Sequence, residues 1–525
     1  MSFRFRLNHG AAAALLAMSL AHPAIAASSA TGPSVAWQAA AGDADIERAF
    51  AQARGEKKPV LLYWGAKWCP PCNQLKATLF NRQDFIERSR AFVAVNIDGD
   101  LPGAQKLGTR FKVRGYPTMI LFNADGAELT RLPGEADAAQ VMQVLQVGLA
   151  GGRPVKSVLA DARAGKPLAA NEWRLLAFYS WETDEQQLVP PAELPGMLTQ
   201  LAVANASGEA ATTTRLWLKA LAASNEAKGL KPDAAVRDRV MAVLADPASA
   251  RVQMDVLVNN APAIVQTLVA AGADKKALLV AFDTALQKLQ ADTGLSRADR
   301  ITALGARVDL ARLDLPKDAA QVQAQMPAAL LTSLREHAAR DDREITDGYE
   351  RQAVITSDAY VLGQAGLWAE SDALLKASLG KSHSPYYLMS QLGSNAKKQG
   401  RKDEALKWYE EAFNKSEGPA TRLQWGSNYL TALVDLAPAE AARIEKAAAQ
   451  LLTEAGQDKA AFYERSARSL QRVGAKLNSW NQDGKHAAAL KRLQAQLDGV
   501  CAKLDSKDAQ RATCEGVLKP SGKKT

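Results

Sequence analysis

Two cysteines separated by two residues constrain this 525-residue chain more than any other feature. Cys69 and Cys72 lie in the sequence WCPPC, directly after the apolar run of residues 60–64. Further along, Tyr116-Pro117 precedes a second apolar run, residues 119–122. A buried strand that leads into a Cys-x-x-Cys pair at the start of a helix is the arrangement of a dithiol redox site. The pattern therefore predicts a reaction as well as a fold.

The chain is too long for a single hydrophobic core, so we expect two or three domains. It carries 65 Lys and Arg residues against 56 Asp and Glu residues, a formal net charge of +9. The two signs are interleaved along the chain, which is typical of a solvated surface. We therefore expect no nucleic-acid partner.

Residues 1–26 have the pattern of a secretory signal peptide. Two arginines precede a short apolar stretch, residues 11–20, and cleavage is expected between Ala26 and Ala27. The apolar stretch is too short to span a bilayer, which takes ~20 residues. We therefore expect a bacterial-type exported protein in the periplasm, an oxidising compartment in which paired cysteines form disulfides or redox centres.

The hydrophobic periodicity divides the rest of the N-terminal part into a linker and an α/β domain. Residues 27–42 are expected to be a linker, and residues 43–150 an α/β sandwich. Within the sandwich, one helix should begin at the cysteine pair, and a turn at residues 123–126 should join two strands into a hairpin. The other helices are expected at 43–54, 104–111 and 137–149, and the strands at 60–64, 92–98, 118–122 and 128–132.

Beyond residue 150 the strand signal disappears, and the apolar residues recur with a helical period of 3.6. Late in this part Gly366 and Gly400 are 34 residues apart, as are Pro385 and Pro419. This spacing resembles that of tetratricopeptide repeats, which are pairs of packed helices. The expected fold class is thus an α/β domain followed by a large all-α helical-repeat domain. Its expected parts are an α-helical array (151–344), tetratricopeptide-like repeats (345–499) and a C-terminal helical hairpin with a basic tail (500–525).

A Cys-x-x-Cys pair at a helix N-terminus is reactive because free backbone N–H groups and the helix dipole favour a thiolate there. We expect Cys69, the more exposed thiol, to attack a substrate disulfide, and Cys72 to resolve the mixed disulfide. Tyr116-Pro117 is expected to be a cis peptide that places the backbone of Tyr116 beside Cys69 to pair with substrate. Trp68 is expected to form a wall of the site. This exchange needs no cofactor.

These motifs resemble the thioredoxin superfamily, in particular the exported thioredoxin-like domains of bacterial thiol–disulfide interchange proteins. The resemblance covers about residues 43–149 and rests on the segments GAKWCPPC, FVAVNID and VRGYPT. It implies a thioredoxin fold in which Cys69 is the nucleophile, Cys72 the resolving thiol and Pro117 the cis-proline.

Two positions depart from the family pattern. Thioredoxins usually bury an aspartate six residues before the first cysteine, and here that position is Tyr63. The lysine that often accompanies it corresponds to Ala94. A phenol, with an ordinary pKa of about 10, is a poor base at neutral pH. The departure predicts slow or water-mediated proton transfer to Cys72, and a slower or more partner-specific enzyme.

Two other interpretations of the cysteine pair remain open. A zinc site would need two further ligands, and the histidines after residue 26 (His337, His383 and His486) are distant in sequence, so no metal is expected. The pair is alternatively a structural disulfide in a redox-inactive thioredoxin fold. Cys501 and Cys514 are expected to form a structural disulfide across the C-terminal hairpin. The alternative is a second redox pair, although their spacing is not Cys-x-x-Cys.

The favoured hypothesis is an exported thiol:disulfide oxidoreductase that exchanges disulfides with protein clients. The helical repeats would recruit these clients or another protein or peptide partner. As a reductant it would need a membrane dithiol donor, and the sequence leaves the choice between reductant and oxidant or isomerase open. The alternative is a non-enzymatic periplasmic adaptor whose thioredoxin-like domain is a docking module. Five basic residues either line a groove of the array or are ordinary solvated charges: Arg335, Arg340, Arg343, Arg351 and Lys402.

Overall fold

The computed structural model describes residues 34–132, 134, 137–184, 187–224, 230–269, 272–315 and 319–520. The predicted signal peptide, the first part of the predicted linker and the last residues of the basic tail lie outside the described residues. Among the described helices, none is both long and apolar enough to cross a membrane.

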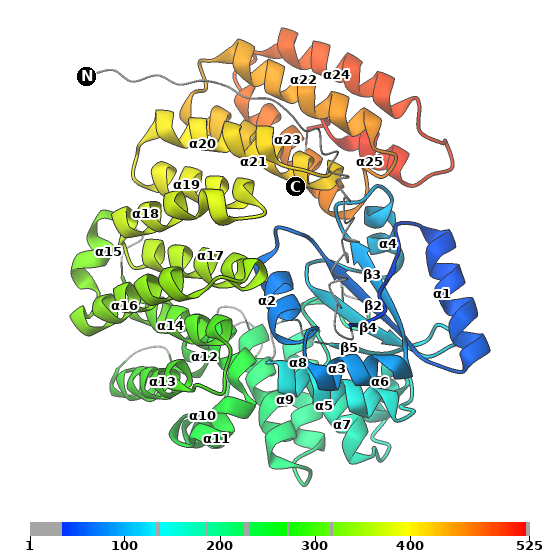
Figure 1. Ribbon diagram of the computed structural model, residues 1–525, viewed down its shortest axis with the longest axis vertical. Coiled ribbons are helices and arrows are strands. Elements are labelled where there is room, and N and C mark those ends of the chain that lie inside the picture. The colour runs from blue at the N-terminus through cyan, green and yellow to red at the C-terminus, as the bar shows by residue number, and fades with distance from the viewer. Residues whose placement is uncertain are drawn as a thin grey trace, which may run out of the picture.

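A five-stranded mixed sheet forms the centre of the N-terminal part (Figure 1). The strand order is β1-β3-β2-β4-β5, with β1, β3 and β2 parallel. β4 and β5 form the predicted antiparallel hairpin, and β4 pairs antiparallel with β2. The strands are β1 (Gln38–Ala39), β2 (Val60–Gly65), β3 (Val93–Asp98), β4 (Thr118–Phe122) and β5 (Glu128–Leu132).

Helices cover both faces of this sheet because its strands are apolar on both sides. Leu62 and Trp64 of β2 point to the face covered by α1 and α4. Leu61 and Tyr63 point to the opposite face, where α2, α3 and α5 pack. These helices are α1 (Asp43–Glu56), α2 (Pro70–Thr78), α3 (Gln83–Arg88), α4 (Ala104–Arg110) and α5 (Ala138–Leu149).

Two short elements were not predicted. Residues 38–39, expected to belong to a linker, form the edge strand β1, and the flanking Val35 and Ala40 are buried. The linker prediction is therefore wrong for this stretch. The six-residue helix α3 was also missed. Neither element is long enough to show a hydrophobic period, which takes a window of about 11 residues or more.

The hydrophobic core continues across the predicted boundary at residue 150. Leu121 of β4 and Leu145 of α5 belong to the same buried cluster as Val158, Leu176 and Leu216 of the following helices. Four helices, α6 (Val155–Arg163), α7 (Ala170–Phe178), α8 (Leu194–Ala204) and α9 (Ala210–Ala223), thus pack onto one face of the α/β part. The α/β domain therefore shares its core with the start of the helical array.

The remaining helices form an array that curves around the α/β part, so that α2 faces its inner side (Figure 1). α2 packs against α17, and α4 packs against α23. The helices of the array are α10 (Ala234–Ala245), α11 (Pro247–Val252), α12 (Met254–Leu268), α13 (Ala273–Ala291), α14 (Arg297–Ala311), α15 (Ala319–Gln325), α16 (Ala328–Glu344), α17 (Gly348–Gln364), α18 (Trp368–Ser378), α19 (Pro385–Lys398), α20 (Lys402–Lys415), α21 (Pro419–Leu436), α22 (Ala441–Gln457), α23 (Glu464–Trp480), α24 (Ala487–Cys501) and α25 (Gln510–Gly516).

The 34-residue spacing coincides with equivalent turns between helices. Gly366 lies between α17 and α18, and Gly400 between α19 and α20. Both glycines have positive φ, 81° and 73°, a conformation that side chains with a Cβ adopt only at a cost. Consecutive helices from α17 to α21 pack against each other. The tetratricopeptide-like assignment itself stays a prediction.

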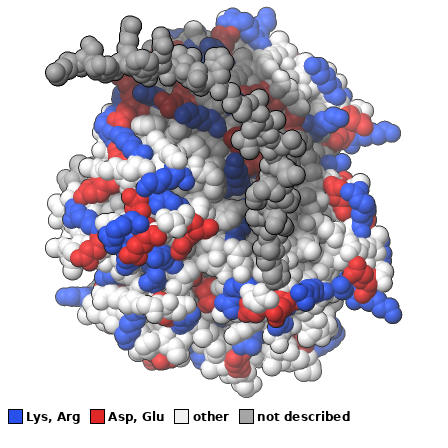
Figure 2. Space-filling view, viewed as in Figure 1, with Lys and Arg blue, Asp and Glu red and all other residues white. Residues whose placement is uncertain are grey.

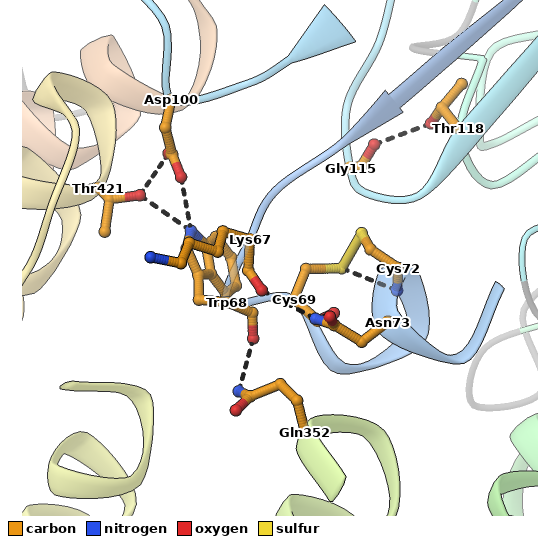
Figure 3. The surroundings of a disulfide bond; sticks show 10 residues. All are labelled: Lys67, Trp68, Cys69, Cys72, Asn73, Asp100, Gly115, Thr118, Gln352 and Thr421. Carbon is orange, nitrogen blue, oxygen red and sulfur yellow. Dashed lines mark hydrogen bonds between the residues drawn. A yellow bond between two sulfur atoms is a disulfide. The ribbon is translucent and has the colours of Figure 1, made fainter. Parts of the chain in front are cut away.

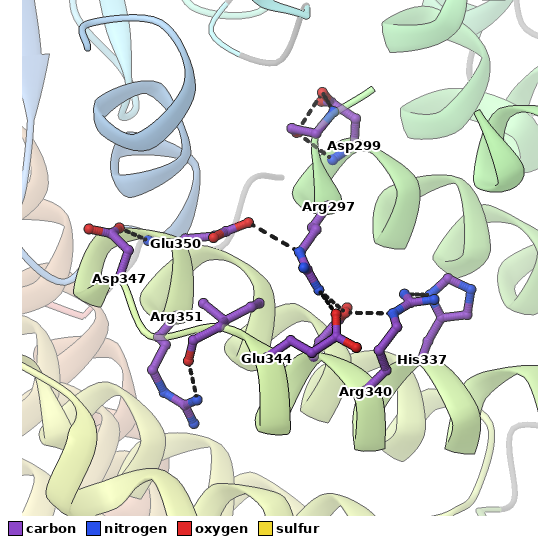
Figure 4. A network of polar contacts seen from close by, with 11 residues as sticks. Arg297, Asp299, His337, Arg340, Glu344, Asp347, Glu350 and Arg351 are labelled. Carbon is purple, nitrogen blue, oxygen red and sulfur yellow. Dashed lines mark hydrogen bonds and ion pairs between the residues drawn. The ribbon is translucent and has the colours of Figure 1, made fainter. Parts of the chain in front are cut away.

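Charged side chains of the array pair mainly with each other. Figure 2 shows basic and acidic residues interleaved over the face in view. In the network of Figure 4, Arg297 binds Asp341 and Glu344 at 3.0 Å each, linking α14 to α16. Four of the five basic residues considered for a groove are in ion pairs, and Arg351 is buried as well: Arg335 with Glu370, Arg340 with Asp341, Arg343 with Glu344 and Arg351 with Asp342.

Candidate functional site

The cysteine pair lies where β2 leads into α2. Cys69 caps the helix, and its Sγ accepts a hydrogen bond from the backbone N–H of Cys72 at 3.2 Å. Pro70 and Pro71 occupy the first helical positions, where a missing N–H costs nothing. The two cysteines form a disulfide with a Cα–Cα distance of 5.2 Å. The Sγ of Cys69 thus lies at the helix N-terminus, where the helix dipole stabilises a thiolate.

Asn73 holds the loop that carries Cys69. Its amide Nδ2 donates to the backbone carbonyls of Lys67 and Cys69, both at 2.8 Å (Figure 3). The side chain is fully buried, so these hydrogen bonds are shielded from water. Asn73 was not predicted as a site residue, because a lone asparagine in a helix has no periodic signal.

The loop before β4 lies beside the disulfide. The Tyr116–Pro117 peptide is cis, and Tyr116 packs against the cluster that contains Cys69 and Cys72. Gln105 of α4 donates to the Tyr116 hydroxyl at 3.0 Å. Thr118 Oγ1 donates to the carbonyl of Gly115 at 2.8 Å, which closes the loop. Tyr116 thus packs against the cysteine cluster, and the pairing of its backbone with substrate stays a prediction.

Trp68 projects from the α/β part into the helical array (Figure 3). Its indole Nε1 donates to Thr421 Oγ1 of α21 at 2.9 Å and to Asp100 Oδ2 at 3.2 Å. Its backbone carbonyl accepts from Gln352 of α17 at 2.9 Å. Its ring stacks on Tyr387 and meets Trp425 edge-on, with centroids 5.9 and 4.9 Å away. Trp68 therefore lines a pocket together with Cys69 and is at the same time a contact between the two parts of the chain.

An ion pair between Asp100 and Arg465 joins the loop after β3 to α23. The side chains are 10% and 13% exposed, and Arg465 lies 5.3 Å from the ring centroids of both Trp68 and Tyr116. Thr421 also donates to Asp100. A paired charge with this little exposure is costly to separate, because either partner alone would be left desolvated.

These contacts bury both cysteines. Cys69 is 2% exposed and Cys72 is not exposed at all. The sequence pattern predicts a Cys69 that is open to a substrate disulfide, and in the full chain Cys69 is buried instead. The difference arises because Trp68, Tyr116 and the inner side of the helical array cover the pair.

Ionisable groups near the pair differ from the usual thioredoxin set. Tyr63 is buried, its hydroxyl has no hydrogen-bond partner among the described residues, and burial raises its pKa. It therefore cannot act as a base at neutral pH. Asp98, beside Gly65 at the end of β3, has its pKa raised mainly by burial. Burial lowers the pKa of Lys76 on α2, while the charge of Asp98 opposes that shift. Asp98 and Lys76 are thus close enough to shift each other's pKa.

Cys501 and Cys514 form a second disulfide, which joins α24 to α25 with a Cα–Cα distance of 5.7 Å. Both belong to the hydrophobic core at the C-terminal end of the array. The pair is part of that core and does not belong to the cluster around Cys69.

The contact residues from the array were missed by the sequence analysis. Gln352, Thr421 and Arg465 lie on three different helices and act on Trp68 and Asp100 from far along the chain. Each is one polar residue on an amphipathic helix, a pattern shared by ordinary surface positions. Only the packing of the array against α2 distinguishes them.

Comparisons with known proteins find relatives of the α/β part. The family described as a thioredoxin-like domain matches residues 46–148. A thioredoxin-like protein of Synechocystis is 37% identical over 93 residues, which is 18% of this chain and 84% of that protein. A solved thioredoxin from Thermus thermophilus is 27% identical, covering 22% of this chain and 85% of that one, with a TM-score of 0.19.

Larger relatives match over the same part alone. The thiol:disulfide interchange protein DsbD of Pseudomonas fluorescens is 32% identical over 104 residues, 19% of this chain and 18% of that protein. DsbD of Yersinia pestis is 32% identical over 115 residues, 21% of this chain and 19% of that protein. The chain thus spans less than a fifth of the length of these relatives. Through the segment at residues 46–148, which holds Cys69 and Cys72, the chain belongs to the thioredoxin-like family.

Proposed function

We propose that this protein is an exported thiol:disulfide oxidoreductase that works through Cys69 and Cys72. The observation that carries the proposal is the position of Cys69 at the N-terminus of α2, in a disulfide with Cys72. The similarity to thiol:disulfide interchange proteins over this segment supports it. The N-terminal pattern of residues 1–26 supports export to the periplasm.

The reaction transfers two electrons without a cofactor. In the reducing direction, the Cys69 thiolate attacks one sulfur of a client disulfide, forms a mixed disulfide and releases the other sulfur as a thiolate. Cys72 loses its proton and attacks Cys69 Sγ, which releases the second client thiol and closes the Cys69–Cys72 disulfide. A dithiol donor, such as a membrane protein, then reduces the pair again. The oxidising direction is the reverse of these steps.

The helical array is proposed to select the client. Its inner side contacts Trp68, next to Cys69, through Gln352 and Thr421, and it contacts the loop after β3 through Arg465. A client must therefore meet the array at the same time as the disulfide. This arrangement favours a partner-specific enzyme over a general disulfide reductase.

Equilibration of the full chain in glutathione redox buffers tests the proposal. The Cys69–Cys72 pair should titrate as one two-electron couple, near about −270 mV for a reductant or near about −120 mV for an oxidant or isomerase. Cys69→Ser and Cys72→Ser should each abolish catalysed disulfide exchange, and Cys72→Ser should trap a mixed disulfide on Cys69. A Cys501→Ala/Cys514→Ala variant should titrate like the parent chain. A pair that never titrates would overturn the proposal.

One observation favours a second function, a non-enzymatic adaptor. The burial of Cys69 at 2% exposure fits a disulfide that stabilises a docking module. In that case a Cys69→Ser/Cys72→Ser variant would fold and keep the biological activity of the parent chain. Loss of that activity with the fold intact supports the oxidoreductase.

A further inference from the structure

A pocket leads to the buried disulfide from one side. Its volume is about 370 Å³, and its lining includes Cys69, Trp68 and Tyr116 from the α/β part. The opposite wall is α23, with Tyr387 of α19 beside it. A volume near the lower end of the range for small-molecule sites, ~300–1,000 Å³, admits a small ligand or an extended segment. The folded surface of a protein cannot reach Cys69 through it.

Arginines dominate the charge of this pocket. Arg465, Arg468 and Arg472 follow each other at helical spacing along α23, and Arg114 faces them from the loop before Gly115. The lining contains a single acid, Glu464. The pocket is therefore basic even though charges over the array as a whole are mixed.

Two of these guanidinium groups have no carboxylate partner. Arg465 is paired with Asp100, and Arg468 with Glu464 at 2.9 Å. Arg472 donates only to the amide oxygen of Asn428, at 3.2 Å, among the described residues. The side chain of Arg114 makes no ion pair or hydrogen bond there either. Both residues are exposed to solvent, so their charges are free to bind an anion in the pocket that Cys69 also lines.

We propose that this pocket binds a thiol or disulfide that carries carboxylates close to its sulfur, and that Arg114 and Arg472 hold those carboxylates. The proposal rests on the proposed function and names its substrate class. Two sources share this chemistry: a free acidic peptide thiol such as glutathione, or an acidic cysteine-containing segment of a protein. Bidentate binding by guanidinium suits carboxylates in both.

The exchange balances with this substrate as the only co-reactant. The substrate thiolate attacks Cys69 Sγ, the Cys69–Cys72 bond breaks, and Cys72 leaves as a thiolate that takes up a proton. A second substrate thiolate attacks the substrate sulfur of the mixed disulfide and releases Cys69. Two thiols have then become one disulfide, and the protein pair has gained two electrons and two protons.

The test compares two thiols that differ only in their carboxylates. The full chain is mixed with glutathione or with its diethyl ester at low salt, samples are acid-quenched and alkylated, and the rate of reduction of Cys69–Cys72 is measured by mass spectrometry. Glutathione should react about tenfold faster, the lower end of the range for a cleft of one charge sign. The preference should shrink at high salt, which screens the arginines.

Variants assign the effect to the pocket. Arg114→Gln/Arg472→Gln should lower the glutathione preference to less than about twofold and leave the ester rate unchanged, since the ester makes no ion pair. Arg114→Lys/Arg472→Lys keeps both charges and should retain most of the preference. Lys407→Gln/Lys503→Gln removes the same net charge from exposed sites outside the pocket and should change nothing.

The same rate comparison is made with an acidic cysteine-containing peptide and its counterpart in which Asn and Gln replace the acidic residues. A carboxylate preference for glutathione supports the free thiol as substrate, and a preference found only with the peptides supports a protein segment. Equal rates within both pairs, or a preference that survives Arg114→Gln/Arg472→Gln, overturn the proposal. Dithiothreitol, a neutral dithiol, distinguishes failure of the substrate proposal from failure of the proposed function. If dithiothreitol also fails to reduce the Cys69–Cys72 pair, the proposed function itself is wrong.

Discussion

Trp68 shows how one residue can change its role between a domain and a whole chain. Next to the first cysteine, its sequence position suggests a surface that substrates touch. Its hydrogen bonds to Thr421 and from Gln352, and its packing on Tyr387 and Trp425, instead place it against the helical array. The side chain that would contact a client in an isolated domain is covered by the helical array of the same chain.

Asp358 is the buried residue with the clearest pH dependence. It lies on α17, is 1% exposed, and neither carboxylate oxygen has a hydrogen-bond partner among the described residues. Burial raises its pKa well above the ordinary value, and the nearby Asp341 adds to the shift while Arg340 opposes it. The folded protein therefore keeps this carboxyl protonated at pH values where the unfolded chain has lost the proton.

We predict that Asp358→Asn stabilises the protein increasingly as the pH rises above about 4. A raised folded-state pKa gives stability that is present below the unfolded-state pKa and lost as the pH rises toward the folded-state pKa. The asparagine removes that loss. Denaturant unfolding of both proteins at several pH values between 4 and 8 measures the difference. Asp238→Asn, an exposed change on α10, serves as the control, and a difference that does not grow with pH would contradict the prediction.

At the scale of elements, the C-terminal hairpin depends on its disulfide. Cys501 and Cys514 join α24 to the seven-residue helix α25, which is too short to be stable alone. The cross-link limits the freedom of the unfolded chain between the two cysteines, and a loop of this size contributes about 3 kcal/mol.

Replacing both cysteines by alanine should therefore destabilise this end of the array by about 3 kcal/mol. Hydrogen exchange should show faster opening of α24 and α25, with the exchange of β2 and β3 unchanged. If the reduction potential of Cys69–Cys72 also moved in this variant, the two pairs would be coupled and the second disulfide would have a redox role.

At the scale of the whole molecule, the helical array restricts access to the disulfide. The contacts at Trp68 and the pair of Asp100 with Arg465 hold the two parts together. A reductant that presents a folded surface can reach Cys69 only when these contacts open. The proposed route for small thiols is the basic pocket instead.

A Gln352→Ala/Thr421→Val variant should favour a state in which the contacts between Trp68 and the array are open. Each change removes a hydrogen bond to Trp68, worth about 1 kcal/mol, so reduction by a small dithiol protein should become about tenfold faster or more. Reduction by dithiothreitol should stay within about twofold. The matched control is Gln391→Ala/Thr431→Val, which makes the same two types of substitution at other positions of the array. If both reductants were accelerated equally, the contacts at Trp68 would not be a barrier to proteins in particular, which would contradict the prediction.

Local sequence patterns predicted the α/β elements and the position of the cysteine pair. The predicted strands and the helix at Cys69 lie within one or two residues of β2 to β5 and α2, because buried strands and proline-rich helix starts are local patterns. The long helices beyond residue 150 were predicted for the same reason. The short β1 and α3 were not, since their few residues hold no period.

What covers the disulfide could not be predicted from local patterns and is set by long-range packing. The burial of Cys69, the role of Trp68 and the basic pocket all depend on residues such as Gln352 and Arg465, which lie far along the chain from the cysteines. Each of these residues looks like any polar position on an amphipathic helix. These residues come together because the array curves around α2. Long-range packing of this kind, unlike helix and strand periodicity, is not encoded in a short stretch of sequence.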